Sequence, residues 1–181
     1  MKILEFAKLI GNLKKTKRAG WTVHKIPHSE SVAEHCFRTI VLALVLSKNL
    51  KLDHEKVVKT AIIHDIGEAL VGDIIKHLGK KTVVNLAQVQ KNEEDAIKKI
   101  FSLIDGAEYI KLYQEYEEMK TKEARFVRQI DRLEFLIQAL EYEQEHKIKL
   151  PKVYSDWVNM VMKDKSLKKI VDQIEKLRRK K

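Results

Sequence analysis

A histidine and an aspartate stand side by side in the stretch AIIHDIGEALVGDI, which runs from Ala61 to Ile74. The stretch begins as apolar as a buried helix, yet His64 and Asp65 are followed by Glu68 and Asp73. Neighbouring residues on a helix point about 100° apart, so the pair can converge only on something small held between them. A metal ion meets that condition. Taken alone, the pair could equally be a core histidine bonded to a carbonyl and a carboxylate at a helix end.

Two more residues, His35 and Asp131, favour the metal interpretation. His35 follows the capping box Ser31-Val-Ala-Glu34, in which the serine hydroxyl accepts from a backbone amide while the glutamate reaches back. Asp131 lies among apolar residues in FVRQIDRLEFLIQAL, where an unpaired carboxylate is costly to bury. An ion pair with Arg128, helped by the neighbouring Arg132, would explain Asp131 but not the whole set.

The predicted ligand set combines two imidazoles and two carboxylates from three helices: His35, His64, Asp65 and Asp131. This mixture suits a divalent transition ion such as Mn, Co, Fe or Zn, and it suits Mg less well because of the histidines. The other histidines lie in polar or loop-like contexts, where exposure to solvent is the default.

The elements that must position these residues are helices. Apolar residues recur at helical spacing, strand-like alternation is nowhere sustained, and the chain has only 6 Gly and 2 Pro. We expect an all-α fold of about six to eight helices, at about 2–13, 31–48, 53–67, 84–104, 107–119, 121–146, 151–162 and 166–179. The pattern predicts one domain over residues 1–181, ending in a helix and basic tail at about 166–181.

Composition narrows the class of protein. The 181 residues are 44% hydrophobic and 34% charged, which is typical of a soluble globular protein. The longest apolar run, Thr39 to Ser47, is about half of a membrane span, and the amphipathic N-terminus does not read as a signal peptide. The single cysteine, Cys36, predicts a reducing cytoplasm.

The net charge of +10 invites an anionic partner. A basic helical nucleic-acid-binding protein is one interpretation, with KKTKR and the LRRKK tail as its contact surface. That interpretation leaves the four candidate ligands unexplained, and lysines interleaved with glutamates usually form a solvated helical face. We therefore expect neither a nucleic acid nor a membrane as the partner.

Five blocks of the chain, in order, resemble one enzyme family. They are RAGW at Arg18–Trp21, ESVAEH at Glu30–His35, HDIGEALVGDI at His64–Ile74, NEEDA at Asn92–Ala96 and VRQIDRLEFLIQALEYE at Val127–Glu143. A helical His, an adjacent His-Asp pair and a later helical Asp are similar to the HD-domain metal-dependent phosphohydrolases. All five blocks together resemble the HD-domain 5′-deoxynucleotidases, which implies a single HD domain and a homodimer.

The resemblance also implies a role for each matching residue. It assigns the metal to His35, His64, Asp65 and Asp131, catalysis to Glu68, the phosphate to Arg18, an accompanying aromatic to Trp21, and the sugar or a second ion to Asp73. Glu68 could contribute to that second ion. The chain departs from some members in reading GDIIKH, without a proline after GD, and in placing Ala19 and Gly20 between the arginine and the tryptophan.

These residues predict hydrolysis of a 2′-deoxynucleoside 5′-monophosphate to deoxynucleoside and phosphate. Glu68, at i+3 from Asp65, would share its face of a continuing helix and could move a proton to or from the reacting groups. Arg18 could grip two phosphate oxygens, or it could belong to the solvated basic run Lys14–Arg18. Trp21 could be a core anchor. The nearest alternative substrates are a cyclic nucleotide, an alarmone or a nucleoside triphosphate.

Overall fold

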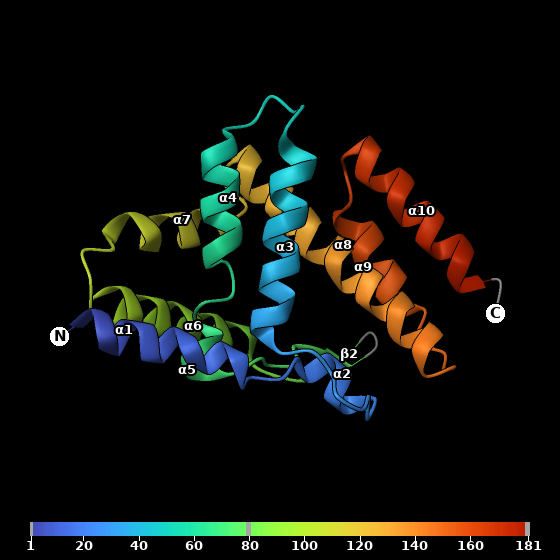
Figure 1. Ribbon diagram of the computed structural model, residues 1–181, viewed down its shortest axis with the longest axis horizontal. Coiled ribbons are helices and arrows are strands. Elements are labelled where there is room, and N and C mark those ends of the chain that lie inside the picture. The colour runs from blue at the N-terminus through green and yellow to red at the C-terminus, as the bar shows by residue number, and fades with distance from the viewer. Residues whose placement is uncertain (1, 79–80, 180–181) are drawn as a thin grey trace.

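Eight helices of nine residues or more form where the apolar spacing predicts them. The computed structural model of the chain, which describes residues 2–78 and 81–179, is shown in Figure 1. In chain order these helices are α1 (Lys2–Ile10), α3 (Val32–Ser47), α4 (His54–Ile63), α6 (Leu86–Phe101), α7 (Ala107–Glu117), α8 (Lys122–Glu145), α9 (Val153–Val161) and α10 (Lys165–Arg179). The predicted all-α class is confirmed.

Several short elements were not expected from the sequence. They are a 3-10 turn η1 (Gly11–Lys14), the helices α2 (Ala19–Val23) and α5 (Glu68–Val71), and the antiparallel pair β1 (His77–Leu78) and β2 (Lys81–Thr82). The helix predicted to continue to Gly67 ends at Ile63, and a turn leads from it into α5. This correction matters because His64 and Asp65 lie in that turn.

Side-chain caps determine where the two helices nearest the candidate ligands begin. The Ser31 hydroxyl accepts from the Glu34 amide at 3.3 Å, and the Glu34 carboxylate accepts from the Ser31 amide at 2.6 Å, so the predicted capping box of α3 is confirmed. Asp53 caps α4, since its carboxylate accepts from the Lys56 amide at 3.0 Å. His35 is thereby held in the first turn of α3.

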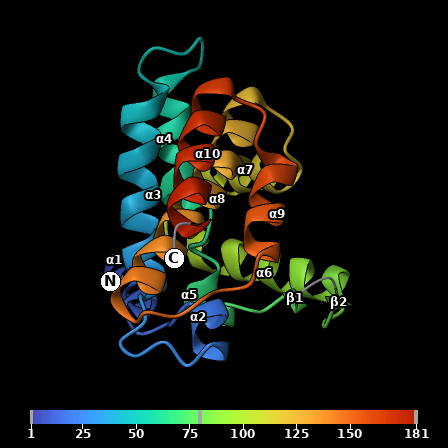
Figure 2. The same cartoon turned by 90° about the vertical axis from the view of Figure 1, so that its right-hand side faces the viewer.

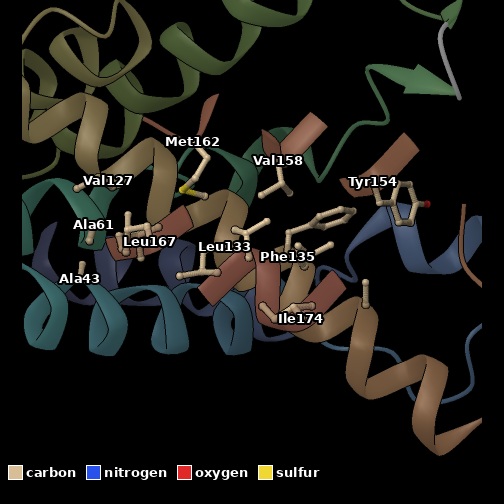
Figure 3. Packing of buried hydrophobic residues seen from close by; sticks show 14 of the residues in the cluster. Ala43, Ala61, Val127, Leu133, Phe135, Tyr154, Val158, Met162, Leu167 and Ile174 are labelled. Atoms are coloured by element: carbon tan, nitrogen blue, oxygen red, sulfur yellow. The ribbon is translucent and has the colours of Figure 1, made fainter. Parts of the chain in front are cut away.

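Helix α8 is the centre of the packing. It contacts α3, α4, α7, α9 and α10, and Figure 2 shows α9 and α10 covering one side of it. Figure 3 shows the main apolar cluster, in which Ala43, Ala61, Leu133, Val158 and Leu167 meet from five helices. Among the described residues, no helix combines the length and apolar character needed to cross a bilayer.

A second apolar cluster lies on the other side of the candidate ligands. It includes Val32 and Ile63 together with Ile97 and Ile100 of α6. Helix α3 contributes Val32 to this cluster and Ala43 to the main one, and α4 is divided in the same way. The start of α3 and the end of α4, which carry His35 and His64, therefore lie where the two clusters meet.

Candidate metal centre

The four predicted ligands come together from three helices and one turn. His35 lies on α3 and Asp131 on α8, while His64 caps the C-terminus of α4 and Asp65 follows it in the turn. His35 has no exposed surface, and His64 and Asp131 are 3% and 5% exposed. The prediction that these residues converge is met by this arrangement, although the His-Asp pair is not on a continuous helix.

The donor atoms are spaced as a bound ion requires. Nε2 of His35 lies 3.4 Å from Asp131 Oδ1, 3.5 Å from Asp65 Oδ2 and 3.4 Å from His64 Nε2. Nε2 of His64 lies 3.4 Å from Asp65 Oδ2. Ligand atoms about 2.1 Å from an ion at tetrahedral angles lie about 3.4 Å apart. The donor set and its dimensions therefore fit a divalent transition ion.

Hydrogen bonds on the far side of each ring aim both histidines at this centre. Nδ1 of His64 lies 2.8 Å from the carbonyl oxygen of Ala61. Nδ1 of His35 contacts the carboxylate of Glu134, which is fully buried on α8. An acceptor at Nδ1 selects the tautomer with a proton there, so the neutral form of each ring carries its free lone pair on Nε2.

The charges of the centre favour cation binding. Burial alone would raise the pKa of Asp131, but Arg132, His35 and His64 outweigh it and hold the pKa well below its usual range. Burial and Arg18 lower the pKa of His35, yet Glu134 and Asp131 outweigh them and raise it to about 9. A bound cation therefore has to displace a proton from this ring.

The ion pair considered as an alternative for Asp131 is made only in part. Arg128 pairs with Glu117 at 2.9 Å and lies 4.0 Å above the ring of Tyr116. Arg132 approaches Asp131 Oδ2 at 3.8 Å, which is a weak contact from a partly exposed side chain. Asp131 Oδ1 remains directed at His35.

Glu68 lies beside the centre with a free oxygen. It opens α5, and its buried Oε2 has no hydrogen-bond partner within the described part of the chain. Burial, reinforced by the charges of Asp65 and Asp73, raises the pKa of Glu68 well above its usual range. It lines a cavity of about 30 Å³ with His64 and Asp65, which is large enough to admit water.

A glycine brings this carboxyl close to α6. A methyl group on Gly67 would lie 3.2 Å from the carbonyl oxygen of Glu93 and 3.4 Å from Ile97. Only a residue without a side chain allows the turn to approach α6 this closely without displacement. Gly67 in the HDIGE block therefore allows the next residue, Glu68, to lie close to α6.

Arg18 and Asp73 reach the centre from separate segments. Nη1 of Arg18 lies 3.2 Å from Asp65 Oδ2, and its Nε lies 3.9 Å from Asp73 Oδ2. The same Asp73 oxygen accepts from the Ala19 amide at 2.7 Å, which secures the segment that carries Arg18. Arg18 therefore points inward and does not belong to a solvated basic face. A second ion at Glu68 and Asp73 stays a prediction.

Trp21 lies in the core. It has no exposed surface, stacks on Phe135 with ring centroids 4.7 Å apart, and donates from Nε1 to Glu30 Oε1 at 2.8 Å. This burial matches the alternative of a core anchor three residues from Arg18. A direct contact between Trp21 and a substrate stays a prediction.

Several polar residues near the centre were not singled out from the sequence. Glu134 holds His35, Arg38 holds Glu134, and Lys76 pairs with Glu93 at 3.0 Å along the cavity. A signal for Glu134 was present, because it stands at i+3 from Asp131 in the same apolar run and shares its face of α8. Lys76 lies just before β1, one of the unexpected strands, and its pairing with Glu93 had no such signal.

The chain is similar in sequence to one family of known proteins. A model of the HD domain matches residues 10–175. The chain is 40% identical over 159 residues to the 5′-deoxynucleotidase HDDC2 of Dictyostelium discoideum, covering 81% of this chain and 83% of that protein. It is 37% identical to the human 5′-deoxynucleotidase HDDC2, covering 80% of this chain and 71% of that protein.

Solved structures agree with this similarity. A conserved hypothetical protein from Pyrococcus furiosus superposes with a TM-score of 0.78 at 30% identity, covering 96% of this chain and 99% of that one. A predicted metal-dependent phosphohydrolase from Magnetospirillum magnetotacticum superposes with a TM-score of 0.72 at 25% identity, covering 97% of this chain and 92% of that one.

Proposed function

The chain belongs to the HD-domain family, and we propose that it is a metal-dependent 5′-deoxynucleotidase that converts 2′-deoxynucleoside 5′-monophosphates to deoxynucleosides and phosphate. One observation carries this proposal. Four donor atoms, three of them on buried residues, lie 3.4–3.5 Å from their neighbours, with a guanidinium and an unpartnered carboxyl beside them. The relatives named as 5′-deoxynucleotidases support the choice of substrate.

We propose that His35, His64, Asp65 and Asp131 hold one divalent ion, with Mn, Co, Fe or Zn preferred to Mg. A bound divalent cation supplies Lewis-acid chemistry, since it lowers the pKa of water and offsets the charge of a phosphoryl group. The mixed nitrogen and oxygen donors support a borderline transition ion. The low pKa of Asp65 and of Asp131 supports binding near neutral pH, because both carboxylates are then ionised.

Arg18 is the proposed phosphate ligand. Its guanidinium is already at the centre, 3.2 Å from Asp65, and is 13% exposed, so it stays reachable by a substrate. The planar fork can donate two parallel hydrogen bonds to phosphate oxygens and so orient the ester for in-line attack. Asp73 secures the Arg18 segment through the Ala19 amide, and we propose that it also contacts the sugar.

Glu68 is the proposed acid and base. Burial raises its pKa and so favours the protonated form, which can donate a proton to the 5′-oxygen of the leaving deoxynucleoside. The oxygen of a water molecule bonds to phosphorus as the bond from phosphorus to the 5′-oxygen breaks, and the carboxylate left behind accepts that water's proton, which restores the starting state. Its position at the cavity wall, with Oε2 unpartnered, supports this role.

The test measures phosphate release from the deoxynucleoside and ribonucleoside 5′-monophosphates with Mn²⁺ or Co²⁺ added. We expect Asp65→Ala to lose both bound metal and activity. Glu68→Gln should keep the metal but lose turnover by about 100-fold or more, which is the contribution of a positioned proton donor. Glu55→Gln, at an exposed partner of Lys59, is the matched control and should behave as the unmodified protein. No release from any deoxynucleotide by metal-loaded protein would refute the proposal.

We also propose a homodimer that works in the cytoplasm. Four apolar residues of α3 are 40% exposed or more, at spacings that form one stripe: Phe37, Val41, Leu44 and Val45. That stripe supports self-association, and light scattering of the purified protein tests it. Cys36, the single cysteine, is buried and free, which supports a reducing compartment.

A further inference from the structure

We infer that Glu134, held in place by Arg38, is a positioning residue that fixes His35 as a ligand of the metal centre; this inference rests on the metal site in the proposed function. The ring of His35 is contacted on opposite sides. Its Nε2 faces Asp65, Asp131 and His64, and its Nδ1 bonds to the Glu134 carboxylate. Both side chains of this pair have no exposed surface.

A single helix provides the ligand carboxylate and the positioning carboxylate. Asp131 and Glu134 are three residues apart on α8, so they lie on the same face, one turn from each other. Asp131 approaches the Nε2 side of the ring and Glu134 the Nδ1 side. A shift of α3 relative to α8 would therefore change both contacts together, which makes this contact between the helices part of the metal site.

The two histidines of the centre are held by acceptors of different strength. His64 has a neutral backbone carbonyl at Nδ1, from Ala61, whereas His35 has a carboxylate. A carboxylate acceptor makes the imidazole a more basic ligand and fixes its orientation. Of the two rings, His35 is thus the one whose contribution depends on a side chain that can be replaced.

Arg38 keeps that buried carboxylate charged and correctly oriented. Its guanidinium donates to Glu134 Oε1 from Nε at 2.9 Å and approaches the same oxygen from Nη2 at 2.8 Å. Nη1, at the other end of the fork, donates to Glu141 at 2.7 Å, and Nη2 also donates to the side-chain oxygen of Gln138. Because Oε1 is occupied by Arg38, Oε2 is the oxygen left for His35. A fully buried carboxylate without such a partner would be too costly to keep ionised.

The experiment measures metal binding without substrate. The dissociation constant for Co²⁺ and the visible spectrum of the Co²⁺-loaded protein are compared for the unmodified protein, Glu134→Gln and Arg38→Gln. We expect Glu134→Gln to weaken binding by about 10–100-fold and to change the spectrum, as loss of a hydrogen-bond partner of a ligating histidine does. Arg38→Gln should cause a smaller loss in the same direction, since the carboxylate stays but is less well held.

Glu141→Gln is the matched control. It makes the same chemical change on another partner of Arg38, but Glu141 is 48% exposed at its side chain and does not touch His35. We expect unchanged Co²⁺ affinity and an unchanged spectrum. A purely structural ion pair between α3 and α8 predicts lower thermal stability for Glu134→Gln with unaltered metal affinity and spectrum, and that result would overturn the inference.

Two outcomes of this experiment need a further comparison. If Glu134→Gln does not fold, as judged by circular dichroism, Arg38→Gln decides the matter, because the Arg38 side chain is 30% exposed and belongs to neither apolar cluster. Unchanged Co²⁺ binding in that variant then overturns the inference. If the unmodified protein binds Co²⁺ and Glu134→Gln binds it more weakly, while no deoxynucleotide is hydrolysed, the proposed function fails and the inference stands.

Discussion

Glu30 is a buried carboxyl whose ionisation should govern how the stability of the metal-free protein changes with pH. It is 8% exposed and accepts a hydrogen bond from Trp21 Nε1 at 2.8 Å. Burial and the nearby charge of Glu134 raise its pKa from 4.5 to about 7. We expect Glu30→Gln, which has the same shape and no charge, to make the protein more stable at alkaline pH than the unmodified chain.

The size of the effect follows from proton linkage. The folded chain keeps the Glu30 proton up to about pH 7, whereas the unfolded chain loses it near 4.5. The stabilisation from that proton is complete below pH 4.5 and is lost as the pH rises through 7. At 1.36 kcal/mol per pH unit, the loss is about 3 kcal/mol. The stability of Glu30→Gln relative to the unmodified protein should therefore increase by about 3 kcal/mol over this range.

Urea unfolding with EDTA present, followed by circular dichroism at pH 5 and pH 8, measures this difference. Glu34→Gln is the control, because hydrogen bonds from the Ser31 backbone and hydroxyl lower the pKa of Glu34. Glu34 is then ionised in both the folded and the unfolded chain over most of this range, so its difference should vary little with pH. An equally flat difference for Glu30→Gln would refute the reasoning.

Two further stability predictions use the same unfolding assay. Arg178 donates hydrogen bonds to both carboxylate oxygens of Glu143 at 2.8 Å and to Ser155 at 2.8 Å. Arg178→Ala should lower the free energy of unfolding by about 3–5 kcal/mol, because it leaves the buried charge of Glu143 without a partner. The control, Arg179→Ala, should lower it by under about 0.5 kcal/mol. Similar losses for both would contradict the first. Gly72 has φ +76°, so Gly72→Ala should destabilise the protein by about 1–3 kcal/mol. The control, Gly20→Ala in α2, should stabilise it by about 0.5 kcal/mol. An unchanged stability for Gly72→Ala would contradict this second prediction.

The helices were predictable because their signals are local. The Ser31–Glu34 capping box placed the start of α3 correctly, and with it His35. The end of α4 was not predictable in this way. Apolar spacing continues past Ile63, and the turn at 64–67 depends on the close approach of Gly67 to Glu93 and Ile97 on α6. A contact between residues so far apart in sequence leaves no local pattern.

The burial of Trp21 in the core was also not predictable from the sequence. A tryptophan three residues after Arg18 is compatible with an aromatic that touches substrate and with a core anchor, because both uses need the same large ring. The choice depends on Phe135, Tyr142 and Tyr154, which surround the ring and come from α8 and α9. None of these residues is close to Trp21 in the chain.

The role of Glu134 was predictable from the same sequence pattern that identifies Asp131. Both are carboxylates in one apolar run of α8, and burying either requires a compensating partner. The metal accounts for the burial of Asp131 but not for that of Glu134, one turn along the same face. The structure supplies the explanation, because a ligating histidine has two nitrogens and the one turned away from the ion needs an acceptor. A buried acid at i+3 from a predicted ligand is therefore a candidate acceptor for another ligand of the same ion.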